Sequence, residues 1–72
     1  MKYFELRFSP IASEEDKSLL AAELLEKGFE SFLDEGDTLL AYIPEGDYSE
    51  AMLGNIYYLH RHPEVKTGEK PY

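Results

Sequence analysis

Cysteine is absent from this 72-residue sequence, so the chain forms no disulfide and offers neither a thiolate metal ligand nor a cysteine nucleophile. Residues 1–5 (MKYFE) lack the apolar core of a signal peptide, and no apolar run approaches the length of a membrane span. We therefore expect a soluble, cytoplasmic chain without a membrane partner. Hydrophobic residues make up 43% of it, which is enough for one folded domain.

Basic residues are scarce. Seven lysines and arginines stand against fifteen acidic residues, which gives a formal net charge of −8. Binding to a phosphate backbone needs clustered basic residues, and here none interleave with the tyrosines, so we expect no direct contact with nucleic acid. Most of the acidic residues lie within positions 1–50. Such a surface either steers a basic protein toward the chain or only keeps a small domain in solution.

Sequence motifs for phosphate binding, metal binding and nucleophilic catalysis are also missing. The five glycines are isolated, so there is no glycine-rich phosphate loop and no pocket for S-adenosylmethionine (AdoMet) in this chain. His60 and His62 have a spacing that points them to different sides of a helix, without a third metal ligand. The acidic turn at residues 34–37 is too short for a calcium loop, and no serine has a nucleophile motif. We predict no catalytic, cofactor-binding or metal-binding residue.

The first half of the chain reads as a strand followed by a helix. Apolar and polar residues alternate over positions 3–8, as in a half-buried strand. Ser13 and Asp16 resemble a capping box, and strong helix formers follow from Glu14 to Lys27. We expect this helix to bury Leu20, Ala21, Leu24 and Leu25. Gly28 then ends it, and Phe29 is placed to fold back onto its last apolar residues.

Two further strands, at residues 29–33 and 38–43, are predicted to form a hairpin around the turn at 34–37. The second of these is apolar on both faces, which is typical of a central strand. A second helix is expected after a capping pair, Asp47 with Glu50, and Pro63 limits it. Residues 64–72 form a polar tail or a short final strand near 64–67.

This order of elements predicts an α+β domain with the ferredoxin-like split β-α-β fold over residues 1–63. Two helices would cover one face of an antiparallel sheet. The first and third strands would lie in its middle and the second at an edge, and the other face would stay available.

Three segments carry a resemblance to a known family: residues 1–6 (MKYFEL), 27–32 (KGFESF) and 39–45 (LLAYIPE). They resemble the amino-terminal domain of bacterial ribosomal protein L-eleven methyltransferase, especially its Bacteroides-type forms, over roughly residues 1–53. Residues 54–62 depart from that pattern. The resemblance implies a ferredoxin-like substrate-recognition domain, joined in the whole enzyme to an AdoMet-dependent catalytic domain that this chain lacks. It also implies, as partner, a basic ribosomal protein of the large subunit, methylated on its amines.

The favoured hypothesis is thus a non-catalytic protein-recognition domain presented as a fragment of such an enzyme. Contact is expected on the sheet face away from the helices, through Leu40 and Tyr42 with Tyr3 alongside. The register of the second strand is open, so Phe32 belongs to either face. Ordinary packing is the alternative role for these four residues. A free-standing regulatory or oligomerisation module is the alternative function.

Overall fold

The first strand, β1 (Tyr3–Ser9), pairs with a neighbour on each side in the computed structural model, which describes residues 2–72. The strands lie in the order β2-β3-β1-β4, and each adjacent pair is antiparallel. The remaining elements are α1 (Glu14–Glu26), β2 (Ser31–Glu35), β3 (Thr38–Pro44), two 3-10 helices η1 (Glu45–Asp47) and η2 (Glu50–Asn55), α2 (Tyr57–Arg61) and β4 (Lys66–Pro71).

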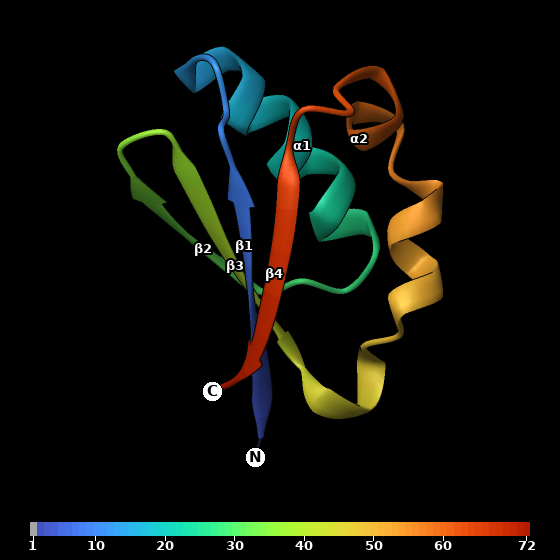
Figure 1. Cartoon of the computed structure of the whole chain (residues 1–72). Coiled ribbons are helices and arrows are strands. Elements are labelled where there is room, and N and C mark those ends of the chain that lie inside the picture. Colours follow the sequence, from blue (N-terminus) through green and yellow to red (C-terminus); the bar gives the residue numbers. More distant parts are fainter. Residues whose placement is uncertain (1) are drawn as a thin grey trace.

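The helices lie together on one side of this sheet, and within the described residues the other side carries no helix (Figure 1). The predicted α+β class and ferredoxin-like arrangement are confirmed, with β1 and β3 in the middle and β2 at an edge. The end of the chain is more ordered than a polar tail. It forms β4, which pairs with β1 from Phe4 to Ser9 and extends well past the predicted residues 64–67.

Helix α1 begins at Glu14, as predicted, but only the Ser13 half of the predicted capping box forms, because the Asp16 carboxylate accepts a hydrogen bond from the Tyr58 hydroxyl at 3.0 Å. The Ser13 Oγ accepts a hydrogen bond from the Asp16 backbone N–H at 3.1 Å, which satisfies one of the free donors of the first turn. Leu20 and Leu24 are fully buried, but Leu25 is 59% exposed, so its predicted burial is wrong. The buried positions run through Lys17, Leu20 and Leu24, a stripe of three- and four-residue steps that leaves Leu25 beside it.

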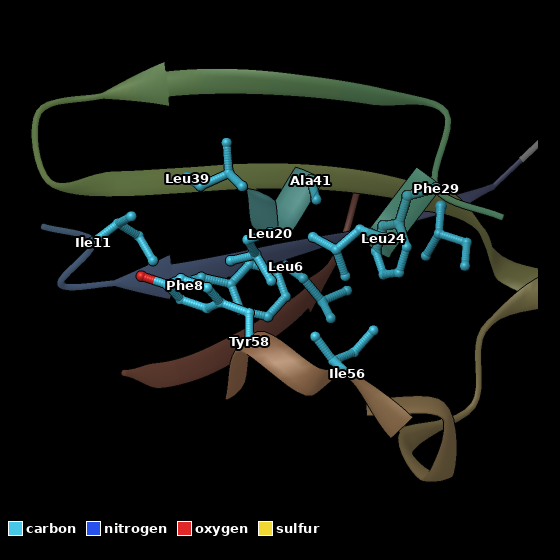
Figure 2. Close-up of a cluster of buried hydrophobic side chains, with 11 residues drawn as sticks. Leu6, Phe8, Ile11, Leu20, Leu24, Phe29, Leu39, Ala41, Ile56 and Tyr58 are labelled. Atoms are coloured by element: carbon cyan, nitrogen blue, oxygen red, sulfur yellow. The ribbon is translucent and has the colours of Figure 1, made fainter. Parts of the chain in front are cut away.

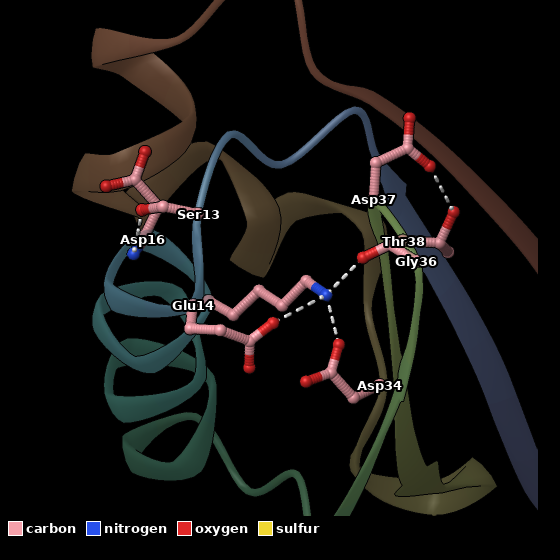
Figure 3. A network of polar contacts seen from close by, with 8 residues as sticks. Ser13, Glu14, Asp16, Asp34, Gly36, Asp37 and Thr38 are labelled. Atoms are coloured by element: carbon pink, nitrogen blue, oxygen red, sulfur yellow. Dashed lines mark hydrogen bonds and ion pairs between the residues drawn. The ribbon is translucent and has the colours of Figure 1, made fainter.

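Lys17 is an unexpected member of that buried stripe, since only 5% of its surface is exposed. Its Nζ donates hydrogen bonds to the carboxylates of Glu14 and Asp34 and to the backbone carbonyl of Gly36. Figure 3 shows how Glu14 of α1 lies close to Asp34 and Gly36 of the hairpin, with these contacts dashed. The hydrogen bond to Asp34 raises the pKa of Lys17, and the same contact lowers the pKa of Asp34. Lys17 thereby fastens the start of α1 to the β2–β3 hairpin.

The junction after α1 forms as its residues predict. Gly28 has a φ of 109°, and the N–H of Phe29 bonds back to the carbonyl of Leu24 at 3.2 Å. Phe29 is 2% exposed and belongs to the core. Because its N–H is committed to the helix end, Phe29 does not pair with β3, and β2 spans Ser31–Glu35, starting two residues later than predicted.

The predicted second helix is not one helix. It is divided into η2 and α2 by Ile56, which is fully buried with φ −92° and ψ 109°. Gly54 and Asn55 are poor helix formers, so burying Ile56 stabilises the fold more than continuing the helix would. The predicted capping by Asp47 is also wrong, because Ser49 caps η2 by accepting a hydrogen bond from the Ala51 N–H at 3.2 Å.

The hydrophobic core lies between the sheet and the helices. Figure 2 shows Leu6 and Phe8 of β1 close to Leu20, with Tyr58 and Ile56 beside them. The helix-facing side of β3 is buried there as well, at Leu39, Ala41 and Ile43. No helix within residues 2–72 is both long and apolar enough to span a bilayer.

Candidate functional site

The side of the sheet without helices, called the open face here, carries Tyr3, Glu5 and Arg7 from β1, Leu33 from β2, and Leu40 and Tyr42 from β3. Strand alternation places these side chains opposite the core residues. Register supports the grouping, because Glu5 lies opposite Tyr42 and Leu33 lies opposite Leu40. The open face is therefore a continuous surface built from β1, β2 and β3.

A hollow of about 500 Å³ lies on the open face. We call it the tyrosine hollow; it is lined by Tyr3, Glu30, Ser31, Leu33, Tyr42 and Tyr72. The Tyr72 N–H donates to the Tyr3 carbonyl at 2.8 Å, which fixes the end of the chain beside β1. The ring centroids of Tyr72 and Tyr42 are then 4.9 Å apart and inclined by 60°, a favourable aromatic geometry.

Glu30 supplies the carboxylate of the tyrosine hollow. It lies just before β2, and its backbone N–H bonds to the carbonyl of Tyr42 at 2.8 Å. The Tyr3 hydroxyl donates to Glu30 Oε1 at 2.7 Å, and this hydrogen bond raises the pKa of Tyr3. Within residues 2–72, Glu30 Oε2 accepts no hydrogen bond. One oxygen of this exposed residue thus orients a tyrosine, and the other remains available to a further donor.

A second carboxylate, that of Glu5, lies beneath the open face with a side chain only 8% exposed. The Tyr42 hydroxyl donates to its Oε2 at 2.8 Å, and Lys70 Nζ lies 3.5 Å from its Oε1. The bond from Tyr42 lowers the pKa of Glu5 despite its burial, and the same bond raises the pKa of Tyr42 to about 12. Glu5 stays ionised and Tyr42 neutral, so this pair fixes the Tyr42 ring.

The four predicted contact residues do not all meet on this face. Tyr3 and Tyr42 both line the tyrosine hollow. Leu40 is on the open face but only 4% exposed, since it lies in register between Arg7 and Leu33. Phe32 lies opposite Ala41 and packs against the core on the helix side, so it is not part of the open face.

Sequence reasoning missed four members of the hollow: Glu30, Ser31, Leu33 and Tyr72. Leu33 is 48% exposed and follows from strand alternation once Phe32 is assigned to the core. Tyr72 is 74% exposed, and its position depends on β4, which was predicted only in part. Glu30 gave no signal in the sequence, because its role depends on the Tyr3 hydroxyl twenty-seven residues away.

The two histidines are engaged separately. His60 Nε2 lies 2.5 Å from the Gly54 carbonyl oxygen, whereas His62 stacks on Tyr58 with ring centroids 4.1 Å apart. His62 Nδ1 is also 3.1 Å from a carboxylate oxygen of Glu64. Among residues 2–72, no three His, Cys, Asp or Glu side chains are grouped so that they could hold a metal ion.

A second hollow of about 500 Å³ lies on the helix side, where Leu19 of α1 faces Tyr57 and Arg61 of α2. Here a side chain of the same chain already contacts the aromatic ring. Arg61 donates from Nη1 to the Tyr57 hydroxyl at 2.6 Å, and its guanidinium carbon lies 5.6 Å from the centre of that ring. Tyr57 is therefore already paired with a cation, unlike the tyrosines of the open face.

Comparison of the chain with known protein families, curated proteins and solved structures found no match. The functional conclusion therefore depends on the chemistry of the open face and on the residue resemblance described above.

Proposed function

We propose that this chain is a protein-recognition domain, the substrate-binding part of an AdoMet-dependent ribosomal protein lysine methyltransferase, and is non-catalytic by itself. The observation that carries the proposal is the open face, where three tyrosines and Leu33 surround a hollow on a sheet whose other side is already packed. Tyrosine supplies large, rigid contact area with a polar end and is enriched at protein interfaces.

Charge supports a basic partner. The net charge of −8 favours encounter with a basic ribosomal protein of the large subunit over encounter with nucleic acid. The segments resembling the methyltransferase, residues 1–6, 27–32 and 39–45, point to the same partner. In this proposal the domain works in the cytoplasm, and AdoMet binds only to a catalytic domain outside these 72 residues.

A second candidate function, an oligomerisation module, is favoured by β4. All six of its residues are exposed, and it is the outermost strand beside β1. An edge strand of this kind can pair with a second copy, although Lys66, Lys70 and Pro71 are residues that commonly discourage such pairing. Sedimentation separates the two functions, since a dimer that forms with rising concentration and has no affinity for ribosomal protein would favour the module.

Two exposed tyrosines on opposite sides of the molecule provide a matched test. We expect Tyr72→Ala to weaken binding of the basic ribosomal protein about tenfold, because it removes one wall of the tyrosine hollow. Tyr57→Ala removes a ring that is 62% exposed on the helix side and should leave affinity unchanged. Isothermal titration calorimetry measures both. The reverse ranking would place the partner on the helix side and reject the open face.

A further inference from the structure

We propose that the tyrosine hollow binds a cationic side chain, arginine being the best match, presented by the partner protein. The identity of that partner as a basic protein rests on the function proposed above. The preference for a cation rests on the hollow itself, whose walls combine aromatic rings with one carboxylate.

The aromatic walls suit a cation because the face of a neutral tyrosine ring carries partial negative charge. Tyr42 is kept neutral and fixed by its hydrogen bond to Glu5, and Tyr3 is fixed by its bond to Glu30. Tyr72 completes the walls at 4.9 Å from Tyr42. A flat guanidinium can stack on such rings, whereas an aliphatic side chain would gain only apolar contact.

Glu30 gives the hollow its charge. Glu30 is an exposed residue, and its Oε1 accepts from Tyr3. Its Oε2 can therefore accept a hydrogen bond from an N–H donor while Oε1 keeps its bond to Tyr3. A guanidinium that stacks on a ring while donating to a carboxylate makes two favourable contacts at once. Two basic side chains, Lys70 and Arg7, lie on the same face but do not line the hollow. Lys70 lies 3.5 Å from the Glu5 carboxylate, and both cations help to lower the pKa of Glu5.

The helix side of the molecule shows the same chemistry within the chain. Arg61 lies over the ring of Tyr57 and donates to its hydroxyl. The Tyr57 ring in the second hollow is thus already in contact with a cation of the same chain. Among the described residues, none that lines the tyrosine hollow is basic, so a cation bound there would come from another molecule.

The test uses a five-residue peptide with a central arginine and the same peptide with citrulline, which keeps the shape but lacks the charge. We expect the arginine peptide to shift the ring-proton NMR signals of Tyr3 and Tyr42 and to bind about fivefold to tenfold more tightly than the citrulline peptide. Glu30→Gln should remove most of that difference. Glu26→Gln makes the same change of net charge at an exposed position on α1 and should preserve it.

Equal binding of the two peptides to the unmodified protein would overturn this inference, as would an unchanged ratio in Glu30→Gln. A different outcome would reject the proposed function. If the ribosomal protein binds through the open face while the peptides show no charge preference, only the cation site is rejected. If the arginine peptide binds at the hollow while the ribosomal protein does not bind at all, the cation site stands and the proposed partner is rejected.

Discussion

Gly28 shows how one residue determines the route of this chain. Its φ of 109° lies in a region that residues with a Cβ rarely adopt, and this conformation lets Phe29 turn back into the core. Steric crowding around position 28 does not explain the need for glycine. A Cβ at position 28 would lie 3.8 Å from the Ile43 Cδ1 atom, an ordinary contact, so the backbone conformation is what requires glycine.

Replacing this glycine should therefore cost stability through the backbone alone. We expect Gly28→Ala to lower the free energy of unfolding by about 1–2 kcal/mol. Gly54→Ala is the matched control, because Gly54 has no positive φ and a Cβ there would meet no atom within 4 Å. It should be neutral or slightly stabilising. Urea denaturation followed by circular dichroism measures both, and equal losses would show that backbone conformation is not the cause.

Helix α2 depends on a neighbouring element for its start. It spans only five residues, from Tyr57 to Arg61, too few to be stable alone. The Glu23 carboxylate of α1 accepts hydrogen bonds from the backbone N–H groups of Tyr57 and Tyr58, at 2.6 and 2.7 Å. A side chain distant in the sequence thus does the work of a local capping residue.

Loss of this contact should loosen α2 without disturbing the open face. We expect Glu23→Ala to destabilise the protein by about 1–2 kcal/mol, the usual cost of losing a helix cap, and to move the amide NMR signals of Tyr57 and Tyr58. Glu26→Ala removes an exposed carboxylate from the same helix and should change stability by less than about 0.5 kcal/mol. If the two variants were equally stable, Glu23 would not be the cap that holds α2.

Local patterns predicted most elements because each carried its own signal. Alternation defined β1, the Ser13 cap and Gly28 bounded α1, and the acidic turn marked the β2–β3 hairpin. The division of the second helix was not predictable in this way. It arises because Ile56 is drawn into the core, which is a tertiary effect. Strand β4 was only partly recognised, since all its residues are exposed and it shows no apolar alternation.

At the scale of the whole molecule, the candidate site is formed by segments that are far apart in the sequence. Tyr3 and Tyr42 were predicted to share a face, and β1–β3 pairing brings them together. Phe32 and Leu33 are adjacent and both apolar, so alternation alone did not decide which one faces the core. The hollow also needs Tyr72, held by a backbone bond to Tyr3, and that contact depends on the complete sheet.

The most direct test of the central claim is an NMR titration of isotope-labelled domain with the basic ribosomal protein of the large subunit. Recognition through the open face predicts saturable amide shifts at Tyr3 and Tyr42, with Leu19 and Tyr57 on the helix side unaffected. Absence of shifts at Tyr3 and Tyr42 at high-micromolar concentrations, or shifts confined to the helix side, would contradict it.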